Sequence, residues 1–144
     1  MDFGDTVYAT ATVVVISVLL FVPMDLVFGL ELWFVGRAVS VFIAALIAGL
    51  IYAGKLADAR IVSIAKVIVL GAIVIMFLTF GILSIATVHD FSSEANPVDT
   101  WTTLQWASLM TYTFRQIFFY VVLLDSVAFM GLYAGSMLRK PKKT

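Results

Sequence analysis

Four long apolar runs dominate this sequence of 144 residues, and they restrict the fold more than any other feature. They extend over residues 7–30, 36–54, 61–88 and 116–138. About 20 helical residues are enough to cross the ~30 Å hydrocarbon layer of a bilayer. The sequence therefore predicts an all-α protein, namely an integral membrane bundle of four transmembrane helices that forms a single domain over residues 1–144.

The composition agrees with this class and excludes several others. Hydrophobic residues make up 62% of the chain and charged residues 12%, whereas soluble domains have roughly 45–50% apolar and about 25% charged residues. A net charge of zero leaves no basic field for nucleic acid. The sequence has no cysteine and one histidine, so thiolate and multi-histidine metal sites are not expected. We also find no paired histidines on a helix, phosphate-binding loop or serine elbow, and expect no enzyme activity, cofactor or metal.

The placement of the cations predicts the orientation of the bundle. Lys55 and Arg60 lie between the second and third runs, and four cations follow Leu138. With four crossings, both groups fall on the same side. Because cytoplasmic loops carry an excess of Lys and Arg, the N and C termini are expected to be cytoplasmic. We accordingly expect a multi-pass protein of the cell (plasma) membrane.

Two segments depart from the simple pattern of four spans. Pro23 is expected to kink or end the first helix, because it lacks a backbone donor. The region from Trp101 to Leu138 has a helical pattern throughout, which corresponds to about 55 Å and exceeds the bilayer thickness. We therefore expect the fourth helix to be extended on the outer side, with an outer loop and helical extension over about residues 89–115. Asp99 or Thr100 is predicted to cap this helix.

Asp125 lies in the middle of the last apolar run. A carboxylate at that depth costs roughly 2.5–3.5 kcal/mol on insertion scales. One interpretation is a structural carboxyl group that is protonated or bonded to a hydroxyl group on a neighbouring helix. The candidate hydroxyl groups are those of Thr10, Thr12, Ser17 and Tyr52. The other interpretation is a site that handles protons or cations.

Five ionisable residues are predicted to form a polar cluster near the outer boundary. Counting the helical rise from the inner ends of the spans places them there: Asp25, Glu31, Arg37, His89 and Arg115. They can act as ordinary interface anchors. Alternatively, they form a vestibule in which Arg37 and Arg115 pair with Asp25 or Glu31, because the planar guanidinium binds carboxylates well. A single histidine such as His89 is more typical of an interface than of a metal site.

Two pairs of small residues have the four-residue spacing that lets helices approach closely. They are Ala45 with Gly49, and Gly131 with Gly135. These residues can pack inside the chain, face lipid, or form a surface for self-association.

These observations favour a protein without chemistry of its own. The expected partners are the lipid bilayer and a membrane protein, or a second copy of the chain, with no nucleic acid. We expect an accessory or interaction subunit of a larger membrane complex, or a homo-oligomer. The alternative is a small oligomeric channel or proton-coupled transporter with Asp125 in the permeation path. A third possibility is an enzyme subunit that contributes Asp125 or the outer carboxylates to a partner's site.

Overall fold

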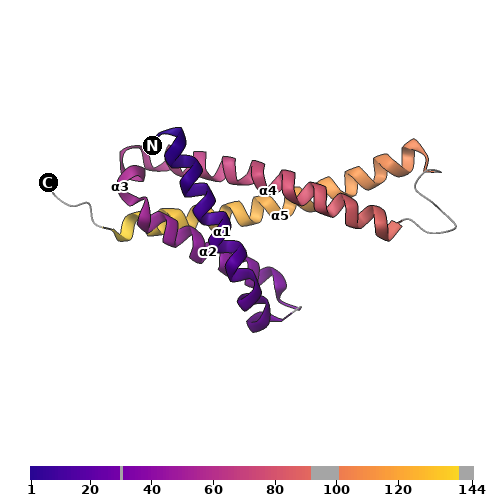
Figure 1. Ribbon diagram of the computed structural model, residues 1–144, viewed down its shortest axis with the longest axis horizontal. Helices are drawn as coiled ribbons and strands as arrows, with labels where there is room; N and C mark the ends of the chain where they lie inside the picture. Colours follow the sequence, from indigo (N-terminus) through magenta and orange to yellow (C-terminus); the bar gives the residue numbers. More distant parts are fainter. Residues whose placement is uncertain (30, 92–100, 140–144) are drawn as a thin grey trace. The chain divides into compact units, whose positions relative to one another are not determined.

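The computed structural model describes residues 1–29, 31–91 and 101–139, without the side chains of residues 79, 80, 83, 84 and 86–91. Over these ranges it contains helices and no strands (Figure 1). The elements are α1 (Phe3–Phe28), α2 (Trp33–Ile51), α3 (Ala53–Leu56), the 3-10 turn η1 (Ala57–Ala59), α4 (Arg60–Phe91) and α5 (Thr103–Leu138). Four of the described helices are long and apolar enough to cross a membrane, which confirms the predicted helical class and suggests a membrane protein.

The chain forms two compact units. The first unit comprises Met1–Ala72 and Leu123–Thr144, and therefore contains α1 to α3, the beginning of α4 and the end of α5. The second unit, Ile73–Val122, contains the rest of α4 and the first part of α5. The single domain over residues 1–144 stays a prediction.

Helix α1 begins and ends at identifiable signals. The Asp2 side chain accepts a hydrogen bond from the Asp5 backbone N–H at 2.7 Å, so the helix begins at Phe3, before the predicted start. Pro23 lies inside α1, and the expectation that the helix ends there is wrong. A proline removes only one backbone donor, and membrane helices tolerate that loss. The helix ends at Gly29, whose φ of 68° suits glycine and whose N–H donates to the Asp25 carbonyl at 3.0 Å.

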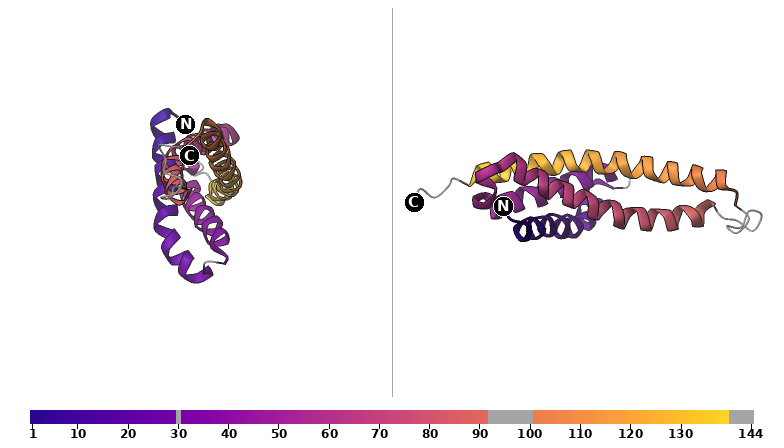
Figure 2. Two further views of the ribbon diagram at one scale, coloured as in Figure 1. Left: turned by 90° about the vertical axis from the view of Figure 1, so that its right-hand side faces the viewer. Right: turned by 90° about the horizontal axis from the view of Figure 1, so that it is seen from above.

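Helices α1 and α2 lie side by side as a hairpin (Figures 1 and 2). Gly36 on α2 allows this approach, since a Cβ atom there would lie 3.3 Å from the carbonyl oxygen of Met24. On the first helix, the buried Thr10 hydroxyl lies 2.8 Å from the Thr6 carbonyl oxygen and 3.3 Å from that of Val67. Helix α1 therefore packs against α2 and also contacts the beginning of α4.

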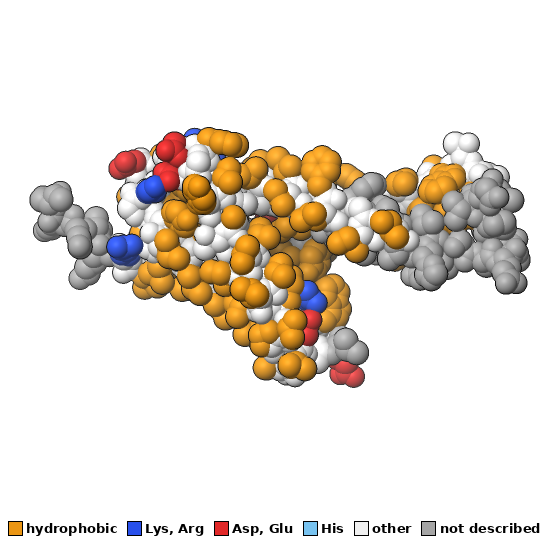
Figure 3. Space-filling model, viewed as in Figure 1, with side chains coloured by type: hydrophobic (Ala, Val, Ile, Leu, Met, Phe, Trp, Pro, Cys, Tyr) orange, Lys and Arg blue, Asp and Glu red, His pale blue; other side chains and the backbone are white. Residues whose placement is uncertain are grey.

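Small side chains form the centre of the first unit. Ala44, Ala45 and Ala48 on α2 are completely buried, as is Leu132 on α5. The outer surface of α1, in contrast, carries large apolar side chains that are more than half exposed. They are Val15, Val18, Leu19, Val22, Leu26 and Val27. Apolar side chains cover much of the visible face of these helices (Figure 3), a surface that suits contact with lipid tails.

The second unit contains a capping box at the start of α5. Gln105 Oε1 accepts the Thr102 N–H at 2.8 Å, and Thr102 Oγ1 accepts the Gln105 N–H at 3.4 Å. The helix therefore begins at Thr103. The residues predicted to cap it, Asp99 or Thr100, lie outside the described ranges. The signal Thr-x-x-Gln was readable in the sequence and was missed.

Helix α5 continues without interruption for 36 residues, a rise of about 54 Å. Its buried side chains in the second unit recur every fourth residue and form one stripe: Leu109, Thr113, Ile117 and Val121. The exposed side chains include several aromatic rings, of which Phe114 and Phe118 stack with centroids 6.2 Å apart. The projection of this segment beyond the bilayer stays a prediction.

Candidate functional site

An ion pair joins the two helices of the α1–α2 hairpin. The Arg37 guanidinium donates a hydrogen bond to Asp25 Oδ2 at 2.7 Å, and its Cζ atom lies 4.2 Å from the centroid of the Phe21 ring. The two side chains are only 28% and 34% exposed. Asp25 Oδ1 and Arg37 Nε are buried and have no hydrogen-bond partner among the described residues. The pair therefore neutralises two charges in an apolar hairpin and leaves one acceptor and one donor unused.

The structure places the other members of the predicted outer cluster separately. Glu31 is exposed in the turn between α1 and α2, and no described residue forms an ion pair with it. Arg115 is exposed on α5 in the second unit. The side chain of His89 lies outside the described residues. The structure thus brings together Asp25 and Arg37, one of the pairings that the sequence allowed, and the vestibule of five residues stays a prediction.

Asp125 is half-buried on α5 and has no hydrogen bond or ion pair with any described residue. Both of its carboxyl oxygens keep some exposed surface, because neither is among the enclosed polar atoms without a partner. The carboxyl group is therefore only partly enclosed by the described residues.

The hydroxyl groups considered as partners of Asp125 are used elsewhere. Thr10 donates to the Thr6 carbonyl at 2.8 Å, Thr12 to that of Tyr8 at 2.8 Å, and Ser17 to that of Val13 at 2.7 Å. Each hydroxyl group has one proton to donate. Tyr52 caps the end of α2, three residues before Lys55, and does not lie near the middle of a span. The interpretation of Asp125 as an acid bonded to one of these groups therefore gains no support.

The predicted helix-packing residues meet in one contact between α2 and α5. A Cβ atom on Gly131 would lie 2.6 Å from the Phe42 carbonyl oxygen and 2.8 Å from Ala45 Cβ. A Cβ atom on Gly49 would lie 2.5 Å from the Leu132 carbonyl oxygen, and one on Gly135 would overlap the backbone of α2. Ala45, Gly49, Gly131 and Gly135 thus pack within the chain, and this contact occupies the face that they would offer to a second copy.

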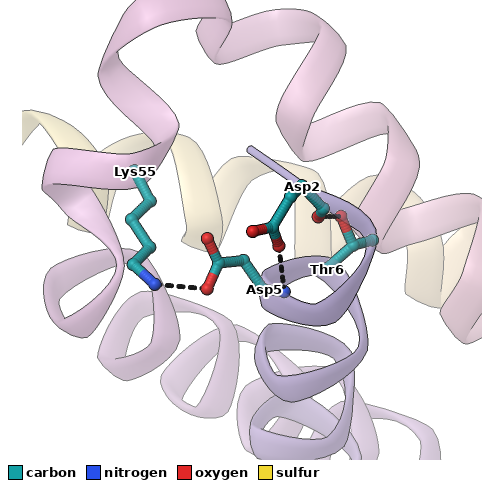
Figure 4. Close-up of polar contacts among 4 residues, drawn as sticks. All are labelled: Asp2, Asp5, Thr6 and Lys55. Carbon is teal, nitrogen blue, oxygen red and sulfur yellow. Dashed lines mark hydrogen bonds and ion pairs between the residues drawn. The ribbon is translucent and has the colours of Figure 1, made fainter.

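Charged side chains gather at one end of the first unit, here called the polar end and defined by Asp5, Lys55, Arg60 and Arg139. Lys55 pairs with Asp5 (Figure 4), and Arg139 lies 3.3 Å from the Leu50 carbonyl and 3.4 Å from the carbonyl of the next residue. These carbonyls belong to the last turn of α2, which lacks intrahelical donors for them. The first contact joins the beginning of α1 to α3, and the second joins the residue after α5 to the end of α2. Sequence analysis missed both.

Among the described side chains, no group of three or more His, Cys, Asp or Glu residues is arranged to hold a metal ion. On the face drawn in Figure 3, charged side chains of the described residues appear at the polar end and on the α1–α2 hairpin. Comparisons with protein-family models, with curated proteins and with solved structures found no match.

Proposed function

We propose that this chain is a multi-pass membrane protein that works by association in the bilayer, as an accessory subunit of a larger complex or as a homo-oligomer. The observation that carries this proposal is the carboxyl group of Asp125. It lies in an apolar helix, is only partly enclosed, and has no partner among the described residues. An ionisable group in lipid is costly unless another polar group meets it, and a partner helix supplies such a group.

The small-residue contact between α2 and α5 bears on how association occurs. Gly131 and Gly135 already pack against α2, so the close-approach face that usually joins membrane helices is occupied. Association is therefore expected to use the exposed side of α5 around Asp125. There a polar interaction with the partner helix replaces the close packing of small residues as the source of affinity.

The alternative is a small channel or proton-coupled transporter. In that case the carboxyl group of Asp125 would face water and a permeating cation in place of a partner helix. Flux measured with purified protein in liposomes distinguishes the two. Ion or proton flux that is lost in Asp125→Asn and kept in Asp58→Asn would support transport, and the absence of flux over a range of ions and potentials supports association.

We expect Asp125→Leu to dissociate the complex or oligomer that the protein forms in its membrane. Wild-type chain, solubilised in a mild detergent, should migrate on a native gel above the mass of a monomer with its detergent micelle. The Asp125→Leu variant should shift at least tenfold more chain into the monomer band. Asp58→Asn is the matched control, because Asp58 is exposed in the η1 turn and its loss leaves the bundle unchanged. A wild-type chain that migrates only as a monomer contradicts the proposal.

We also propose that the polar end faces the cytoplasm. The chain has no cysteine, so single cysteines can be labelled without background. Asp58→Cys lies beside the polar end and Glu31→Cys lies in the turn at the other end of the hairpin. An impermeant maleimide added outside intact cells should label Glu31→Cys and spare Asp58→Cys until the membrane is opened. The reverse pattern would contradict the proposed cytoplasmic position of the polar end. Equal labelling of both variants in intact cells would contradict the proposal that α1 and α2 cross the membrane.

A further inference from the structure

We infer that the group that meets Asp125 is a Lys or Arg side chain on a transmembrane helix of a different membrane protein, and not a second copy of this chain. This inference rests on the proposed function and specifies its partner. It follows from the charges available at the depth of Asp125, from the faces already used in packing, and from the size of the side chains around the carboxyl group.

The charges at depth leave Asp125 without a counter-ion. About 21 Å of helical rise separate Asp125 from Arg139 at the polar end. Arg139 contacts the carbonyl of Ile51 at the end of α2. Measured from Ile51 along α2, Arg37 also lies at about 21 Å of helical rise. Arg37 is already bound to Asp25 at 2.7 Å and rests on the Phe21 ring. Apart from Lys66, which lies near the polar end of α4, the charges at this depth in the described part of the first unit therefore sum to one unpaired acid.

A second copy would not correct this imbalance. Two copies inserted in the same orientation carry the same groups at the same depth, so each copy adds an acid and an arginine that is already paired. Lys66 is exposed on α4, but it lies only about 9 Å of rise from Arg60, and a lysine at that position can extend its long side chain to the polar end. Arg115 lies about 15 Å beyond Asp125 along α5. Neither cation of a second copy is level with the carboxyl group.

The surface around Asp125 favours a long basic side chain over a hydroxyl group. Val122, which is 46% exposed, and the half-buried Phe129 lie three residues before and four residues after the acid, on the same face of α5. Such large side chains keep a partner helix at an axis separation of about 8–10 Å. Ser or Thr would need the close approach that glycines allow, whereas Lys and Arg carry their charge on stems of three or four methylene groups.

A photocrosslinker at Phe129 tests the inference in the native membrane. The residue is one turn from Asp125, and its ring stacks on Tyr133 with centroids 6.4 Å apart, so p-benzoylphenylalanine is a conservative replacement. We expect an adduct with one other protein, with the crosslinked peptide carrying Lys or Arg within a helical turn of the reacted residue. Asp125→Asn should reduce the adduct about tenfold. Asp125→Lys should abolish it, and changing the partner's cation to Asp should restore it. The same crosslinker at Leu19, which is 69% exposed on α1, should give no Asp125-dependent adduct.

The outcomes separate this inference from the proposed function. An Asp125-dependent adduct with the mass of two copies, or with a helix that has no Lys or Arg near the reacted residue, overturns the basic partner and keeps association. No Asp125-dependent adduct overturns both. A second measurement uses a defined probe, a leucine-alanine transmembrane peptide with one central lysine, in phosphatidylcholine vesicles. By energy transfer it should bind the wild-type chain at least tenfold more tightly than its all-apolar analogue, and Asp125→Asn should remove this difference.

Discussion

Replacing Gly131 or Gly135 with alanine is expected to destabilise the first unit by about 1–3 kcal/mol, the usual cost of overpacking a well-packed core. The added Cβ atom of Gly131→Ala would lie 2.6 Å from the Phe42 carbonyl oxygen. That oxygen belongs to the helix backbone, so it cannot move aside as a flexible side chain would. Relief requires α2 and α5 to separate, and this loses packing along the whole contact. Thermal unfolding in detergent, followed by circular dichroism, measures the effect.

Gly81→Ala is the matched control for these variants. Gly81 also lies within a long helix, but an added Cβ atom would meet nothing within 4 Å. Alanine is the better helix former by about 1 kcal/mol, so this variant should be as stable as the wild type or slightly more stable. Gly131→Leu, which adds three further carbon atoms at the same contact, should lose the folded unit. A Gly131→Ala chain that unfolds at the wild-type temperature would contradict the α2–α5 contact.

Arg37→Gln is expected to destabilise the α1–α2 hairpin by about 1–3 kcal/mol, because it leaves the Asp25 carboxylate without its main donor. Fully buried ion pairs lose about 3–5 kcal/mol when one partner is removed. A loss of only about 1–3 kcal/mol is expected here, because the Arg37 and Asp25 side chains are 28% and 34% exposed. Asp25→Asn should have an effect of the same sign, since it leaves the guanidinium facing the Phe21 ring with no carboxylate.

A double-mutant cycle isolates the ion pair from other effects of these changes. If Asp25 and Arg37 stabilise each other, Asp25→Asn combined with Arg37→Gln should cost less than the two single changes added together. The exchanged pair, Asp25→Arg with Arg37→Asp, should recover part of the stability. Arg115→Gln is the control, because Arg115 is exposed on α5 and should shift the unfolding temperature little. Additive single effects would show that the pair does not couple the two helices.

The length and composition of the apolar runs were enough to predict the helices. A run of 20 or more apolar residues has one stable conformation in lipid, because a helix satisfies its own backbone hydrogen bonds. The boundaries were less well predicted. Asp2 and Thr102 cap α1 and α5 through hydrogen bonds that depend on local spacing, and the effect of Pro23 on α1 was overestimated.

Counting the helical rise placed Arg37 and Asp25 in one predicted polar cluster, with their pairing as one of two interpretations, and the structure shows the pair. The sequence could not tell which helix the small residues pack against. The spacing of Gly131 and Gly135 defines a face of α5, and any helix or lipid chain can lie on that face. The tertiary contact with Gly49 and Ala45 decided this question.

By itself, then, the sequence determined the helical class, the candidate spans and the presence of an acid within the last one, since these depend on local composition and on rise per residue. Only the tertiary structure decided which polar groups are used. It showed Arg139 on the end of α2, Lys55 paired with Asp5, and Asp125 without a hydrogen bond to any described residue. The physical reason is that a partner is fixed by the side-by-side placement of helices distant in sequence, and such placement results from packing that no single segment encodes.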